Sequence, residues 1–164
     1  MGEHACDTAA RIIQDAITYS FVTATDSDVV KIDKILGFIH SHVEYQTRLL
    51  DHMWFPTETL TFKSGDCTSF SILVACMFEK AGIKSAIGFF TNDTLGRHAM
   101  VLVRLHNLDG YPSRYYSDLT SFNLTTGEWI KIEPQCISLS DYSHNLDWMS
   151  YWSIVAASEV PYGA

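Results

Sequence analysis

The stretch from Cys67 to Phe78 constrains the fold most, because its 12 residues carry no charged side chain. Helical spacing places one apolar stripe along it, formed by Phe70, Leu73, Val74, Met77, Phe78 and Ala81. Ile72, Ala75 and Cys76 make the opposite side apolar too. A helix that is apolar on nearly every side lies buried at the centre of a domain. This one is too short to span a bilayer, and Gly82 is expected to end it as a left-handed cap.

Two amphipathic helices are predicted before this segment. The first has apolar residues at Ala9, Ile12, Ile13, Ala16 and Ile17. The second follows Ser27 or Asp28 as its cap, with apolar residues at Val29, Ile32, Leu36, Ile39 and Val43. Residues 45–66 show no sustained period and contain Pro56, so they are predicted to form a surface loop.

The apolar period changes to two after Gly82, which indicates strands. Strands are expected at 83–90, 98–105, 113–119 and 128–134; residues 146–160 fit helix or strand, and we favour strand. The connections are too short for parallel crossovers, so the sheet is predicted to be antiparallel. The sequence therefore predicts one α+β domain over residues 1–164, with helices first and the sheet second.

Composition and charge exclude several classes of protein. Hydrophobic residues make up 47% and charged residues 18%, as in an ordinary globular chain. The net charge of −8, with no basic stripe, argues against nucleic acid as a partner. The N-terminus lacks the pattern of a signal peptide, so no membrane partner and a cytoplasmic location are expected. The oligomeric state is not indicated.

The cysteines are widely spaced, with no C-x-x-C pair. Reduced thiols are therefore expected, with Cys76 as a packing residue. Cys67 differs, because it stands at the first turn of the buried helix, directly after Asp66. There the helix dipole stabilises an anion by ~0.3–1 kcal/mol. Taken alone, Cys67 is either a core residue or an activated thiol.

Three further side chains could complete a reactive site. His98 begins an apolar strand and could take a proton from a thiol. Glu133 closes the strand at 128–134 and could orient that imidazole; Asp118 is the competing acid. Taken alone, each also fits an ordinary polar position at the surface or a strand end.

Metal sites are less favoured by the sequence. His40 and His42 point apart on a helix, and Cys67, His98 and Glu133 lack the spacing typical of a zinc site. Neither a phosphate-binding glycine loop nor a calcium loop is found, so no cofactor is expected.

Four short motifs occur in order: Gly65-Asp66-Cys67, Gly82-Ile83, His98-Ala99, and Trp129 to Pro134 with Glu133 between them. Together they cover about residues 35–135 and closely resemble the transglutaminase-like superfamily. The resemblance implies a papain-like fold, in which the cysteine-bearing helix packs on the antiparallel sheet. It also implies a catalytic triad of Cys67, His98 and Glu133.

Two departures from the family pattern are visible. Ser69 stands where many members carry an acidic residue. The interval from His98 to the acid is also lengthened, so Asp118 remains an alternative to Glu133 as the acid of the triad.

The activity implied by the resemblance is thiol-dependent acyl transfer or hydrolysis at an amide of a protein or peptide. The Cys67 N–H would supply one oxyanion donor, and Tyr45, Gln46 or Trp54 the second. Two alternatives remain: a catalytically silent binding or structural module of a larger protein, and a glycopeptide amidase. The sequence does not decide between water and an amine as the acceptor.

Overall fold

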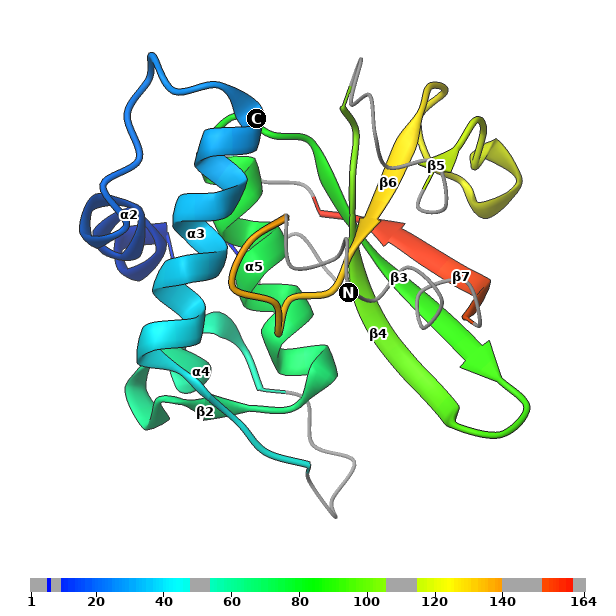
Figure 1. Cartoon of the computed structure of the whole chain (residues 1–164), viewed down its shortest axis with the longest axis horizontal. Helices are drawn as coiled ribbons and strands as arrows, with labels where there is room; N and C mark the ends of the chain where they lie inside the picture. The colour runs from blue at the N-terminus through cyan, green and yellow to red at the C-terminus, as the bar shows by residue number, and fades with distance from the viewer. Residues whose placement is uncertain (1–5, 7–9, 48–53, 106–114, 140–151, 161–164) are drawn as a thin grey trace.

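The computed structural model describes residues 6, 10–47, 54–105, 115–139 and 152–160 (Figure 1). Its helices are α2 (Ala10–Tyr19), α3 (Asp28–His42), α4 (Pro56–Phe62), α5 (Cys67–Lys80) and the short 3₁₀ helix η2 (Thr120–Phe122). Its strands are β1 (Glu44–Tyr45), β2 (Ser64–Gly65), β3 (Ser85–Asn92), β4 (Gly96–Val103), β5 (Tyr115–Tyr116), β6 (Trp129–Ile132) and β7 (Ser153–Glu159). Helices come first and the main sheet second, so the prediction of an α+β fold is confirmed.

The main sheet has five strands in the order β5-β6-β4-β3-β7, and every neighbouring pair is antiparallel, as predicted. The prediction of a strand near the C-terminus is confirmed by β7, although residues 146–151 lie outside the described residues. The strand predicted over 113–119 is reduced to β5, and residues 113 and 114 also lie outside the described residues. Strand β4 lies at the centre of the sheet, between β6 and β3.

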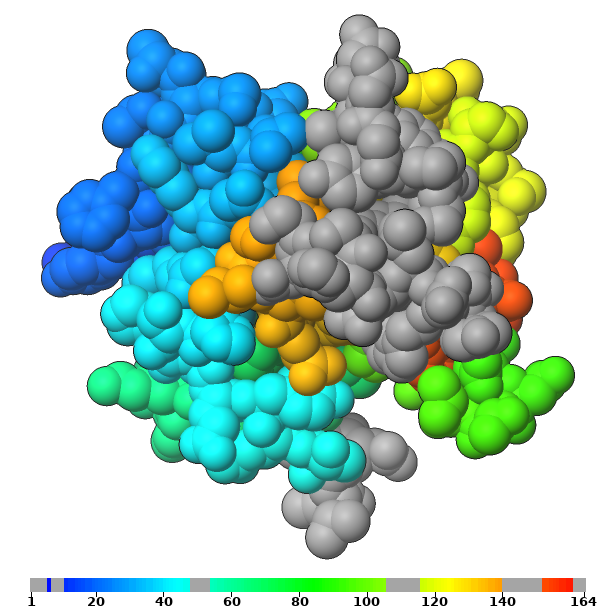
Figure 2. Space-filling view, viewed as in Figure 1, coloured from blue at the N-terminus to red at the C-terminus, as the bar shows by residue number. Residues whose placement is uncertain are grey.

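Helix α5 lies between the other helices and the sheet, as Figure 1 shows. Every residue from Ser69 to Phe78 is buried, which confirms the central position that the uncharged run predicts. Figure 2 shows α3 on the outer surface and the turn between β3 and β4 protruding at the lower right. Among the described helices, none is both long and apolar enough to cross a membrane.

Both ends of α5 follow from local sequence signals. Asp66 is the N-cap, and its side chain accepts a hydrogen bond of 2.9 Å from the backbone N–H of Ser69. Gly82 follows the last turn with φ of +87°, the left-handed conformation that glycine adopts at little cost. Helix α5 thus begins and ends at the local signals that the sequence predicts.

The loop predicted over residues 45–66 is wrong in part. It contains α4, and its flanks form a short parallel pair of β1 with β2. Pro56 starts α4, because a proline at the first helical position lacks only an N–H that would be unpaired there. Glu58 accepts a 3.0 Å hydrogen bond from the backbone N–H of Phe55 and completes this start. Residues 48–53 lie outside the described residues.

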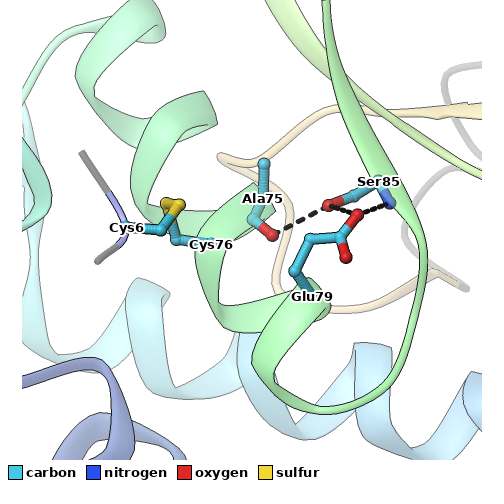
Figure 3. Close-up of a disulfide and its surroundings, with 5 residues drawn as sticks. All are labelled: Cys6, Ala75, Cys76, Glu79 and Ser85. Atoms are coloured by element: carbon cyan, nitrogen blue, oxygen red, sulfur yellow. Dashed lines mark hydrogen bonds between the residues drawn. A yellow bond between two sulfur atoms is a disulfide. The ribbon is translucent and has the colours of Figure 1, made fainter. Parts of the chain in front are cut away.

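The prediction that the cysteines are reduced is also wrong for two of them. Cys6 and Cys76 form a disulfide across 70 residues of sequence (Figure 3). Their Cα atoms are 5.6 Å apart, within the range that a disulfide spans. The bond joins the N-terminal segment to the buried middle of α5, so Cys76 is more than a packing residue. Cys67 and Cys136 are free thiols.

Candidate active site

Cys67 is the first residue of α5, and the chain approaches it through a tight passage at Gly65. A Cβ atom on Gly65 would lie 2.9 Å from the Cβ of Ser69 and 3.1 Å from Cδ1 of Phe70. Only glycine fits this approach, which brings β2 close against the first turn of the helix. The partly buried thiol of Cys67 therefore lies at the N-terminal end of the helix.

The Cys67 thiol lies against the start of β4. Its sulfur is hydrogen-bonded to the His98 side chain and accepts a hydrogen bond from the backbone N–H of Ala99. The Thr68 hydroxyl lies 4.0 Å from the same sulfur. Burial alone would raise the pKa of the thiol, but these hydrogen bonds and the charge of His98 lower it below its ordinary value. The site thus favours a thiolate.

His98 joins Cys67 to Glu133. Nε2 of His98 donates to Oε2 of Glu133, which leaves Nδ1 as the ring nitrogen for the thiol. Oε1 of Glu133 accepts a 3.2 Å hydrogen bond from the backbone N–H of Gln135, so both carboxylate oxygens are held. The side chains of His98 and Glu133 are only 9% and 6% exposed. The structure therefore brings the three sequence-predicted residues into one hydrogen-bonded series.

The register of the sheet explains why Glu133 reaches His98. Strands β4 and β6 are antiparallel neighbours, with Val101 opposite Ile132, so the chain that leaves β6 runs toward the His98 end of β4. Asp118, the competing acid, is exposed and accepts hydrogen bonds of 2.9 Å from the backbone N–H and hydroxyl of Thr120. The Asp118 carboxylate is therefore held at the first residue of η2 and not at the imidazole.

The charges of the series favour an ion pair. Burial would lower the pKa of His98, but its hydrogen bonds to Cys67 and Glu133, and the charge of Glu133, raise it to about 9. The pKa of the thiol is lowered by the same imidazole. Both shifts favour a thiolate beside an imidazolium over the neutral pair, as the chemistry of a cysteine nucleophile requires.

Tyr45 also contacts the first residue of α5. The backbone N–H of Cys67 donates a hydrogen bond to the phenol oxygen of Tyr45. Burial, followed by the negative charges of Cys67, Glu133 and Asp66, raises the pKa of Tyr45 to about 12. The phenol packs edge-on against Phe70, with ring centroids 5.6 Å apart. Tyr45 thus keeps its proton and lies at the backbone donor predicted for an oxyanion.

The other two oxyanion candidates are placed differently. The backbone N–H of Gln46 donates to Gly65 O at 2.8 Å, within the pairing of β1 and β2, and the residue is exposed. The backbone N–H of Trp54 donates to the Ser69 hydroxyl at 3.3 Å, and its ring packs against Phe62. Of the three, Tyr45 is the one in contact with the Cys67 N–H.

Trp152 is a site residue that the sequence did not identify. Its ring packs against the imidazole of His98, with centroids 5.1 Å apart. Trp129, in contrast, donates its indole N–H to Thr125 O at 3.0 Å. Trp152 lies in an apolar run without a clear period, and only the pairing of β7 with β3 brings that run to the site. The two tryptophans in the run were the one available signal.

An open groove of about 580 Å³ leads to the thiol. Its lining includes Cys67, Thr68, Phe89, Arg97, His98 and Val155. Within the described part of the chain, no group of three or more His, Cys, Asp or Glu residues is placed to hold a metal ion. The arrangement is suited to a thiol that attacks a group bound in the groove.

Comparison with known proteins identifies the family and the fold. Residues 15–144 match the sequence model of the transglutaminase-like superfamily. A solved structure titled as a "putative cysteine protease", from Cytophaga hutchinsonii, is similar in fold, with a TM-score of 0.50 and 15% sequence identity. The similarity covers 95% of this chain but 49% of that one, so the chain spans about half the length of its structural neighbour. A comparison with curated proteins finds no match.

Proposed function

Because the chain belongs to the transglutaminase-like superfamily, we propose that it is an enzyme in which Cys67 attacks an amide carbonyl of a protein or peptide. The observation that carries the proposal is the hydrogen-bonded series from Cys67 through His98 to Glu133, at the end of an open groove. Cys67 is the nucleophile, His98 the general acid and base, and Glu133 the residue that orients the imidazole.

The reaction begins with the Cys67 thiolate and the His98 imidazolium. The sulfur forms a bond to the carbonyl carbon, and the electron pair of the carbonyl moves to its oxygen. When the tetrahedral intermediate collapses, the C–N bond breaks and His98 gives its proton to the leaving amine. The product is a thioester on Cys67. Water or an amine, deprotonated by His98, then displaces the sulfur and releases either an acid or a new amide.

Two hydrogen-bond donors are proposed to stabilise the oxyanion. The first is the backbone N–H of Cys67, which the start of α5 holds in place. The second is the Tyr45 phenol, whose pKa of about 12 keeps it protonated throughout the working pH range. An incoming carbonyl oxygen would take the Cys67 N–H from the phenol oxygen and receive the phenol proton as its second hydrogen bond.

Alkylation by iodoacetamide between pH 5 and 8, mapped by mass spectrometry, tests the proposal. Cys67 should react much faster than Cys136 at pH 6, because only Cys67 combines a helix N-terminus with a hydrogen-bonded imidazole. Cys6 and Cys76 should stay unlabelled without reductant, because they are bonded to each other. His98→Ala should reduce the Cys67 rate to that of Cys136. Equal rates for the two free thiols in the native protein would favour a catalytically silent module.

A further inference from the structure

The face of the sheet beside Cys67 carries a set of side chains that the proposed chemistry does not use. Thr91 pairs with Arg97 and Phe89 with Ala99 across β3 and β4. Cross-strand partners two residues apart share one face of a sheet, so these side chains lie together. These residues and Cys67 line the same groove. The groove therefore extends from Cys67 across β4 and β3 toward β7.

A bulge in β7 adds an apolar side chain to that face. Phe89 pairs with Ala156 and Phe90 with Ile154, so Val155 is an extra residue between two consecutive partners. Bulges re-aim side chains and occur frequently beside active sites. Val155 lines the groove and is 54% exposed, and Phe89 beside it is 39% exposed. Together they form an apolar surface that bound substrate could cover.

Arg97 gives the same groove a positive charge. It is exposed, directly precedes His98 and lies in the groove lining. Among the residues that the structure describes, no acidic side chain forms an ion pair with it. A guanidinium binds carboxylates through two parallel hydrogen bonds. The chain as a whole carries a net charge of −8, so attraction of an acidic ligand here must come from Arg97 locally.

We propose that the groove selects a peptide segment that combines an acidic side chain, bound by Arg97, with an apolar side chain, packed on Phe89 and Val155. This inference rests on the proposed function for the identity of the ligand as a peptide. It goes further by naming the residues that choose among peptides.

Binding to a Cys67→Ala variant tests the proposal without turnover. The probes are fluorescein-labelled ten-residue peptides that contain one leucine. Each of the remaining positions is occupied, one position at a time, by Asp, Asn or Lys. Fluorescence anisotropy gives Kd for each peptide. At the best position, Asp should bind about three- to tenfold more tightly than Asn, as expected for a partly exposed charge pair, and Lys more weakly than Asn. Asp and Asn within twofold at every position, or no binding by any peptide, would overturn the proposal.

Charge reversal provides the matched control. In the same background, Arg97→Glu should make Lys the preferred residue. Arg11→Glu, an equal charge change on exposed α2, should leave the Asp preference intact. If both variants reduce the preference equally, the effect comes from net charge and the assignment to Arg97 is wrong.

Val155→Thr tests the apolar part of the proposal. The variant should weaken binding of the leucine-containing peptide about two- to fourfold, because one methyl group of the apolar surface is replaced by a hydroxyl. Binding of the same peptide with glycine in place of leucine should be unchanged. Equal weakening of both peptides would overturn the apolar contact. A silent binding module would show the same selectivity but fail the alkylation test, so failure of this inference and failure of the proposed function are distinguishable.

Discussion

Helix α5 carries two cysteines nine residues apart, and they have opposite chemistry. Cys67, at the first residue, is a partly exposed free thiol beside an imidazole. Cys76, in the middle, is fully buried and bonded to Cys6. The residue type and the helix are the same, so the difference comes from position. The first turn places Cys67 at a helix N-terminus beside the imidazole, and the middle places Cys76 in the core against Cys6.

The comparison separates reactivity from stability along one helix. The N-terminal end of α5 gathers polar groups that favour a charged sulfur, and it gains little packing from them. The middle contributes a covalent bond and a buried surface. We therefore expect changes at the first end to alter chemistry and changes at the second to alter unfolding.

The largest effect is expected from Glu133→Gln. The substitution keeps the shape of the side chain but no longer fixes the imidazole through a carboxylate, and turnover should fall by about 10⁴-fold, as for the orienting acid of a serine-protease triad. Steady-state kinetics on the first peptide substrate found would measure it. Asp118→Asn is the control and should change turnover less than twofold, since Asp118 is exposed and binds Thr120. The reverse order of damage would show that the orienting acid is misassigned.

Removal of the disulfide by Cys6→Ala should mainly change stability. Releasing a cross-link over 70 residues should lower the free energy of unfolding by about 4 kcal/mol, measured by urea denaturation. Turnover per folded molecule should stay within twofold, because Cys76 lies more than two turns of α5 from Cys67. Cys136→Ala, which removes a free thiol, serves as the control. A large loss of turnover in the folded Cys6→Ala protein would show that the middle of α5 also affects the chemistry at Cys67.

The rate of alkylation and the rate of amide turnover should depend differently on pH. Turnover needs the proton of His98, whose pKa is raised to about 9, so it should fall about tenfold per unit above that pH. Alkylation needs only the thiolate, whose pKa is lowered, so it should not fall there. The two limbs belong to the coupled pair of groups. Parallel loss of both rates above pH 9 would argue against an imidazolium as the acid.

The smallest effect is expected at the cap of α5. Asp66→Ala removes the side-chain acceptor for the Ser69 N–H and should lower the free energy of unfolding by about 1 kcal/mol. Asp66→Asn keeps an equivalent cap and should stay within a few tenths of wild type. Thermal denaturation compares the two. Equal destabilisation by both variants would mean that the charge, and not the hydrogen bond, secures this end.

Local signals explain why some parts of the fold could be predicted. Asp66 and Gly82 act on neighbouring backbone groups, so their roles can be inferred from sequence alone. The contact of His98 with Glu133 follows from strand direction, and that required only the order of the strands. Helix α4 was missed because Pro56 marks a helix start as well as a break, and Glu58 was the neglected second signal.

Distant contacts could not be predicted in the same way. Cys6 meets Cys76 only after α2 and α5 pack, and nothing near Cys6 in the sequence encodes its partner. Trp152 reaches His98 through the pairing of β7 with β3, across more than fifty residues. The β7 bulge that exposes Val155 depends on the same pairing. These features arise from packing between elements, which a single sequence does not display.

The disulfide has a mechanical consequence for a chain pulled from its two ends. The bond withholds from extension the chain between Cys6 and Cys76, a sequence separation of 70, or about 240 Å of contour length at full stretch. Force would therefore act first on the strands, beginning with β7 at the sheet edge, which follows Trp152 in the chain. Trp152 would leave His98 while the helical layer still held. In an optical trap, the fully unfolded protein would be shorter by that contour length until a reductant was added.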